Sequence, residues 1–130
     1  MNLTIEKGSF VAIVGPTGSG KTTLVDTILG IIQPSEGSIK ISGKIPTDAI
    51  RTWPGSMSYV PQQIHISRGS VLENIALGYP INSKVSLLAL ESSKLAELNL
   101  DLEYEVGENG SNLSGGQRQR IGIARALLTN

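Results

Sequence analysis

Residues 15–22 read Gly-Pro-Thr-Gly-Ser-Gly-Lys-Thr, and this glycine-rich run begins where the apolar segment Phe10–Val14 ends. Glycine adopts positive φ freely and carries no side chain, so consecutive backbone N–H groups can curl around one anion. The apolar segment predicts a buried strand, and the residues from Lys21 predict a helix that Gly30 and Pro34 bring to an end. Strand, glycine loop and helix in this order predict an α/β fold with an anion at a helix N-terminus.

The loop fits the pattern of glycine, four residues, then Gly-Lys-Thr, which is the P-loop of nucleotide-binding proteins. Lys21 would reach the β- and γ-phosphates as a mobile charge, and Thr22 would offer its hydroxyl to magnesium. A glycine-rich turn without a ligand is the alternative, and the strand and helix on either side favour the phosphate site. The predicted nucleotide-binding residues are Gly15, Thr17, Gly18, Ser19, Gly20, Lys21, Thr22 and Thr23.

The amino-acid composition excludes several classes of partner and site. Eleven basic side chains balance eleven acidic ones, so no net field draws the chain to nucleic acid, and no nucleic acid is expected as a partner. The absence of cysteine excludes disulfides and thiolate metal sites. No apolar run approaches the roughly 18 residues that span a bilayer. Any membrane-spanning part would therefore lie in other segments or subunits.

The residues after the first helix predict more strand and then helix. Apolar patterns predict short strands at 38–42 and 57–60, with loops marked by Pro46, Pro54 and Gly55.

Further along, Ser70 and Glu73 have capping-box spacing and predict a short helix that ends at Gly78. A longer helix is expected from Ser83, followed by a polar loop over residues 99–112.

Residues 113–117 read Leu-Ser-Gly-Gly-Gln and begin a last predicted helix. Ser114 and Gln117 have capping-box spacing, so a well-capped helix is one interpretation. A hydroxyl and two glycine amides at a helix N-terminus also form an anion site. The run through Leu127 resembles the signature motif and helix of ABC ATPases. The residues expected on the buried face of this helix are Ile121, Ala124 and Leu128.

In that family each P-loop faces the signature motif of a partner across a head-to-tail dimer. The resemblance therefore implies that ATP and Mg²⁺ bind at the P-loop, with Lys21 acting in catalysis. It also implies that the ATP of the partner subunit contacts the signature residues Ser114, Gly115, Gly116 and Gln117.

Two further stretches carry the resemblance. Residues 59–62, Tyr-Val-Pro-Gln, look like the Q-loop, whose glutamine, here Gln62, positions magnesium and the attacking water. Residues 104–110 resemble the Thr-Glu-Val-Gly-Glu stretch of exporter-type ATPases, which touches the transmembrane domain. Tyr104 stands where threonine is usual, and the Leu-Pro-x-Gly-Tyr stretch usual before this loop is absent.

The family pattern extends beyond these residues. An adenine-stacking aromatic upstream, and the Walker B carboxylates, D-loop and switch histidine downstream, have no counterpart here; His65 is expected to be a solvated loop residue. We therefore expect the 130-residue chain alone to bind ATP without hydrolysing it, and to leave an apolar strand edge at Phe10–Val14 unpaired.

The resulting interpretation is an α/β fold: a partial P-loop NTPase (RecA-like) core with an antiparallel β portion and an α-helical subdomain. Residues 1–69 would form the core through the Q-loop, 70–112 the helical subdomain and acidic loop, and 113–130 the signature motif and helix. The expected role is that of an ABC exporter at the cytoplasmic face of a membrane. Its partners would be a second ATP-binding domain and a transmembrane domain, fused or separate. A soluble ABC-type ATPase acting on DNA or ribosomes, or a nucleotide-binding fragment without turnover, are the alternatives.

Overall fold

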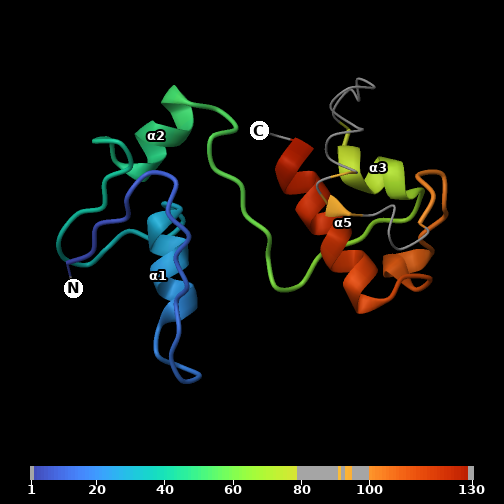
Figure 1. The fold of residues 1–130 in the computed structure, drawn as a ribbon, viewed down its shortest axis with the longest axis horizontal. Helices are drawn as coiled ribbons and strands as arrows, with labels where there is room; N and C mark the ends of the chain where they lie inside the picture. Colours follow the sequence, from blue (N-terminus) through green and yellow to red (C-terminus); the bar gives the residue numbers. More distant parts are fainter. Residues whose placement is uncertain (1, 79–90, 92, 95–99, 129–130) are drawn as a thin grey trace. The chain divides into compact units, whose positions relative to one another are not determined.

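The structure, a computed structural model, describes residues 2–78, 91, 93–94 and 100–128 (Figure 1). The chain falls into two compact units, Met1–Pro54 and Gly55–Asn130. None of the described helices is long and apolar enough to cross a bilayer. The helix expected from Ser83 lies outside the described residues, and the predicted division at 69/70 and 112/113 stays a prediction.

Helices account for the regular structure of the described residues. The first unit contains α1 (Lys21–Ile28) and α2 (Pro46–Thr52). The second unit contains α3 (Val71–Ala76), the short 3-10 turn η2 (Glu108–Gly110) and α5 (Gly115–Leu128).

Helix α1 begins where the sequence predicts it. Its N-cap, Gly20, has a left-handed backbone (φ 87°, ψ 13°) that turns the glycine loop directly into the helix. At the other end the amide of Gly30 donates to the Thr27 carbonyl at 3.1 Å. The amide of Ile31 donates to the Asp26 carbonyl at 2.9 Å. This pair of bonds is a Schellman motif, so the prediction that Gly30 ends the helix is confirmed.

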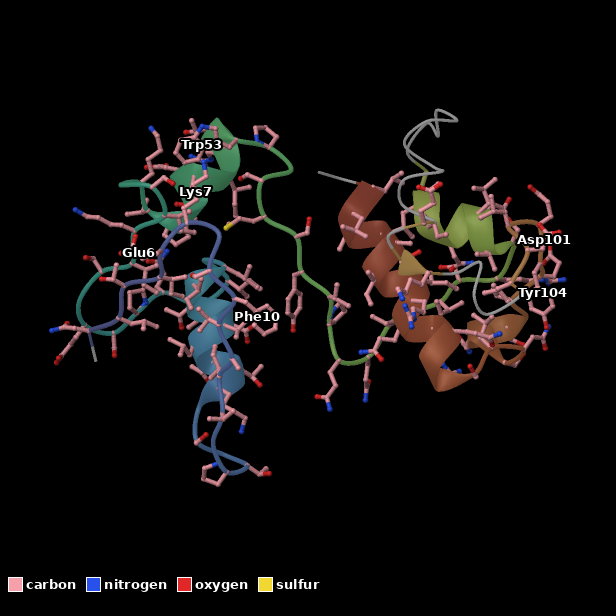
Figure 2. The ribbon with its side chains drawn as sticks, in the orientation of Figure 1. Glu6, Lys7, Phe10, Trp53, Asp101 and Tyr104 are labelled. Carbon is pink, nitrogen blue, oxygen red and sulfur yellow. The ribbon has the colours of Figure 1, made fainter. Side chains whose placement is uncertain are left out.

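The buried strand predicted at Phe10–Val14 is absent, and that prediction is wrong for this structure. The segment is irregular, and the side chains of Phe10 and Val14 are 98% and 87% exposed (Phe10 is labelled in Figure 2). A core strand is stable when neighbouring strands pair with its N–H and C=O groups. No strand in the described part of the chain pairs with this segment, and Phe10 and Val14 remain exposed. Because no strand forms here, the expected unpaired strand edge is not observed as such.

The strands predicted at 38–42 and 57–60 do not form either. The first stretch contributes one isolated antiparallel bridge, between Ile41 and Lys44, in which the Ile41 amide donates to the Lys44 carbonyl at 2.7 Å. The expected antiparallel β portion is thus unconfirmed, since one bridge in a tight turn does not make a sheet.

Helix α2 corrects the prediction that Pro46 lies in a loop. Pro46 is the first residue of the helix, after an extended N-cap at Ile45 (φ −64°, ψ 153°). Proline suits that position because its φ is already helical and the N–H it lacks would have no partner. Ala49 is fully buried, and the helix ends at Thr52. The C-cap residue that follows is Trp53, whose ring centre lies 5.9 Å from the Lys44 ammonium.

Helix α3 has the capping box that the sequence predicts. The Ser70 hydroxyl oxygen accepts from the Glu73 amide at 3.2 Å, and the Ser70 amide donates to the Glu73 carboxylate at 2.8 Å. The helix ends at Ala76, and Leu77 takes a left-handed conformation (φ 47°) just before Gly78. The predicted short helix and its stop are confirmed.

The hydrophobic core of the second unit lies between α3 and α5. The predicted inner face of α5 is confirmed, since Ile121 and Ala124 are fully buried and Leu128 packs against the core. The buried members of this core are Ile66, Val71, Ile75, Leu100, Val106, Leu113, Ile121 and Ala124.

The expected polar loop covers the first turn of α3. The Val71 amide donates to the Tyr104 carbonyl at 3.0 Å, and the Leu72 amide donates to the Leu102 carbonyl at 2.9 Å. These amides have no acceptor within their own helix, so the loop completes the hydrogen bonding of α3.

Candidate functional site

The glycine loop of the first unit is exposed to solvent and contains two glycines with a left-handed backbone. Gly18 and Gly20 have φ of 82° and 87°, and a Cβ on either would meet no atom within 4 Å. Glycine is therefore required by backbone conformation here. Gly15 differs, because a Cβ there would lie 2.8 Å from the Ser19 hydroxyl oxygen. The Ser19 amide donates to the Pro16 carbonyl at 3.2 Å and closes the turn.

Lys21 folds back over this loop. Its ammonium donates to the carbonyl oxygens of Gly15 and Pro16, both at 2.8 Å. A positive charge is thereby held beside the first turn of α1, whose free amides also attract anions. The hydroxyl-bearing residues Thr22 and Thr23 are exposed at the helix start. The residues present thus fit a polyphosphate with an associated cation.

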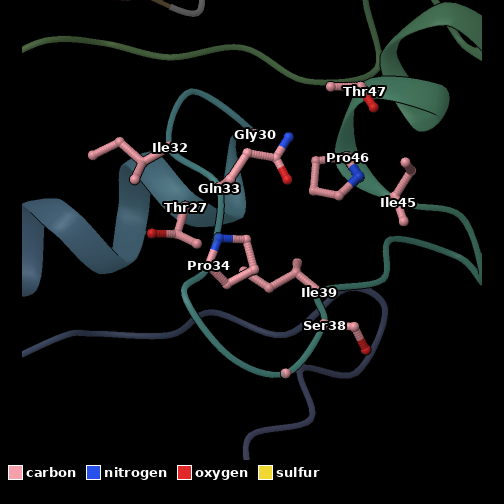
Figure 3. Close-up of a pocket in the computed structure, with 11 residues that line it drawn as sticks. Thr27, Gly30, Ile32, Gln33, Pro34, Ser38, Ile39, Ile45, Pro46 and Thr47 are labelled. Atoms are coloured by element: carbon pink, nitrogen blue, oxygen red, sulfur yellow. The ribbon is translucent and has the colours of Figure 1, made fainter.

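A separate pocket of about 150 Å³ lies between the end of α1 and the start of α2 (Figure 3). Thr27, Pro34, Ile39 and Pro46 are among its lining residues, and no charged side chain lines it. A Cβ on Gly30 would lie 2.8 Å from the Cβ of Pro46, so this glycine allows the close approach of α2. Because no cationic side chain lines it, this pocket is poorly suited to phosphate, and no residue of 15–23 lines it.

The start of α5 forms a second open helix terminus. The Ser114 hydroxyl oxygen accepts from the Gln117 amide at 3.2 Å, and the Ser114 amide donates to the Gln117 side-chain oxygen at 2.8 Å. The capping-box interpretation is confirmed as local structure. Gly115 and Gly116 are exposed, and a Cβ on either would meet nothing within 4 Å. A cap and an anion site are compatible, because a serine hydroxyl that accepts one bond can still donate another.

An open groove of about 420 Å³ connects Gln62 with the start of α5 in the second unit. The predicted Q-loop glutamine and the signature glycine Gly115 therefore share one groove, whereas Thr22 belongs to the first unit. A joint magnesium role for Thr22 and Gln62 stays a prediction. The residues that line the groove are Gln62, Gln63, Ile64, Asn109, Gly115, Arg118 and Gln119.

The acidic stretch of residues 104–110 is held in place by a backbone hydrogen bond and one buried side chain, and its carboxylates are exposed. Val106 is fully buried, and its amide donates to the Gly69 carbonyl at 2.9 Å. Glu105 and Glu108 are exposed on either side of it. Figure 2 labels Tyr104, the residue that departs from the family pattern, and its side chain is 42% exposed.

Sequence reasoning did not single out Arg125 and Asn74, which hydrogen-bond to each other between α5 and α3. The available signal in the sequence is a basic residue four positions after Ile121 and directly after Ala124, both of which are predicted to be buried. The side chain of His65 is exposed, as expected of a solvated loop residue.

Comparison with known proteins identifies the family. The family model described as "ABC transporter" matches residues 1–130. The chain is 40% identical over 135 residues to rat ATP-binding cassette sub-family C member 3, covering 100% of this chain and 8% of that protein. It is 42% identical over 139 residues to the probable multidrug resistance ABC transporter ATP-binding/permease protein YheI of Bacillus subtilis, covering 100% of this chain and 23% of that protein.

Solved structures agree with this assignment. A bacterial Atm1-family ABC exporter with ATP bound matches with a TM-score of 0.73 and 31% identity, covering 88% of this chain and 21% of that one. The chain belongs to the ABC transporter family, and the structural match is consistent with the P-loop NTPase fold. It spans less than a quarter of the length of these relatives.

Proposed function

We propose that this chain is the ATP-binding part of an ABC exporter, in which ATP binding and hydrolysis in a head-to-tail dimer drive transport across a membrane. The observation that carries the proposal is that one chain contains two exposed helix N-termini that are each suited to bind phosphate. One is preceded by a glycine loop with a lysine held over it, and the other is capped by Ser114. The names of the relatives, which include a multidrug resistance ATP-binding/permease protein, support transport.

At its own P-loop the chain would hold ATP mainly by backbone amides and one lysine. Lys21 would exchange its two carbonyl partners for β- and γ-phosphate oxygens, which are stronger acceptors because they are charged. Magnesium, bound through Thr22 and Gln62, would supply charge neutralisation on the phosphates. The remaining contacts to ATP are assigned to Gly15, Thr17, Gly18, Ser19, Gly20 and Thr23.

At its signature the chain would serve the ATP of a partner subunit. The donors there would be the Ser114 hydroxyl and the amides of Gly115 and Gly116, with Gln117 holding the cap. Gln62 lies in the same groove as Gly115, so it would sense whether the signature is engaged.

The acidic stretch of residues 104–110 is proposed as the contact with the transmembrane domain, on the cytoplasmic side. Its carboxylates are exposed while Val106 anchors it in the core. A partner could therefore pull on this stretch and transmit force to the N-terminus of α3, which the stretch caps.

A mixing experiment on the intact ATP-binding domain tests the shared site. Ser114→Arg fills the phosphate position of the partner's site and leaves its own P-loop unchanged, while Lys21→Ala does the opposite. Each variant alone should lose ATP-driven dimerisation, measured by sedimentation in a hydrolysis-blocked background. The mixture should recover some dimer through its one intact composite site. Normal dimerisation of Ser114→Arg would contradict the proposal.

A further inference from the structure

Arg125 is a half-buried cation whose partners are neutral oxygens. Its Nε donates to the backbone carbonyl of Asn74 at 2.5 Å, and its Nη1 donates to the backbone carbonyl of His65 at 2.6 Å. Its Nη2 donates to the Asn74 side-chain oxygen at 3.1 Å. Burial lowers the pKa of Arg125 below its ordinary value. Three directed bonds from one rigid, planar fork offset this desolvation, an arrangement that lysine cannot reproduce.

Asn74 completes this network from the side of α3. It is 2% exposed, and its side-chain nitrogen donates to the carbonyls of Ser67 and Ser70 at 2.9 and 3.0 Å. Its side-chain oxygen accepts from the Ser67 amide at 2.9 Å as well as from Arg125. All four hydrogen-bonding positions of the amide are therefore used. The network links α5 to α3 and to residues 65–67 by direct hydrogen bonds.

The segment held in this way is the one that carries Gln62. His65, which Arg125 binds through its carbonyl, comes three residues after Gln62 in the chain. Between them, Ile64 packs directly on the backbone of α5, because a Cβ on Gly122 would lie 2.5 Å from its Cδ1 atom. Ile64 also lines the groove that contains Gln62.

A second attachment to α5 lies on the other side of Gln62, where the Ser58 hydroxyl donates to the Ala126 carbonyl at 2.8 Å. The chain is therefore bound to α5 both before and after Gln62, at Ser58 and at His65. Both bonds are near the C-terminal end of α5, and the signature lies at its N-terminal end. We propose that Arg125 is a positioning residue for Gln62, which holds Gln62 in register with Gly115 across their shared groove. The expected effect on ATP hydrolysis rests on the proposed function, whereas the expected effect on the local structure around residues 62–67 does not.

Amide hydrogen exchange on the 130-residue chain tests the structural part. Arg125→Met keeps the aliphatic bulk and removes all three donors, and Arg125→Lys restores a charge and a donor. Arg120→Met, which removes a bond to the Ser93 carbonyl, is the control on the same helix. Exchange at the Ser67 amide should accelerate by about tenfold or more in Arg125→Met, less in Arg125→Lys, and not in Arg120→Met. Unchanged exchange, or equal acceleration throughout the second unit, would overturn the proposal.

Steady-state ATP hydrolysis by the intact transporter tests the functional part. Arg125→Met should lower kcat by about tenfold while KM stays within about twofold, because the P-loop is untouched and only the placement of Gln62 is lost. Arg125→Lys should recover part of kcat. A loosened Ser67 amide with unchanged kcat would overturn the positioning role. Absence of turnover in the unmodified protein would instead refute the proposed function and leave the exchange result standing.

Discussion

Ser114 and Gln117 bind each other's backbone amides at the start of α5, through bonds of 3.2 and 2.8 Å. Ser114 therefore has two roles that one substitution pair can separate. Ser114→Ala removes the cap and should destabilise the 130-residue chain by about 1 kcal/mol. Ser114→Asp keeps a good cap but places a negative charge where the partner's phosphate would bind.

Urea unfolding followed by far-UV circular dichroism measures the first effect, and ATP-driven dimerisation of the intact domain measures the second. Both variants should fail to dimerise, although only Ser114→Ala is less stable. Normal dimerisation of Ser114→Asp would show that Ser114 is a cap and nothing more.

Gly110 should be intolerant of a side chain for two reasons. Its φ is 71°, and a Cβ would lie 3.0 Å from the Cβ of the buried Ile66. Gly78 has a similar φ of 85°, but a Cβ there would meet nothing within 4 Å. Gly110→Ala should cost about 1–3 kcal/mol more than Gly78→Ala, which carries the conformational cost without the overpacking. Equal unfolding free energies for the two variants would refute the packing role of Gly110.

The exposed apolar segment at Phe10–Val14 should make the chain prone to self-association. Phe10 is 98% exposed, so Phe10→Lys removes apolar surface without disturbing a core. Light scattering at increasing concentration should show markedly slower aggregation of Phe10→Lys. Ser38→Lys, which adds the same charge at an exposed polar position of the same unit, should have little effect. Equal aggregation of the unmodified chain, Phe10→Lys and Ser38→Lys would mean that this segment does not mediate self-association.

Sequence reasoning succeeded where local chemistry decides the structure. The caps at Ser70 and Ser114, the glycine that ends α1 and the buried face of α5 all follow from side chains within a few residues of one another. It failed at the strands, because a strand needs partners far along the chain, which an apolar pattern does not supply. It missed α2 because Pro46 is equally typical of a loop and of a first helical turn. Arg125 escaped notice since its partners are backbone carbonyls from distant segments.

Binding and hydrolysis should separate in the 130-residue chain. The carboxylates that the family resemblance assigns to magnesium and to the attacking water are not among these residues, while the phosphate loop is complete. Phosphate release should therefore stay far below the roughly 1 per second of ordinary enzymes. Turnover at that rate, abolished by Lys21→Ala, would show that another group in the chain activates water.

The most direct test of the account is isothermal titration of the chain with ATP and magnesium. The unmodified chain and Lys40→Ala, which removes an exposed lysine from the same unit, should bind with equal affinity. Lys21→Ala removes the ammonium that the Gly15 and Pro16 carbonyls hold over the loop, and should weaken binding by at least about tenfold, or 1.4 kcal/mol. Equal affinity of Lys21→Ala and the unmodified chain would contradict the assignment of residues 15–23 as the ATP site.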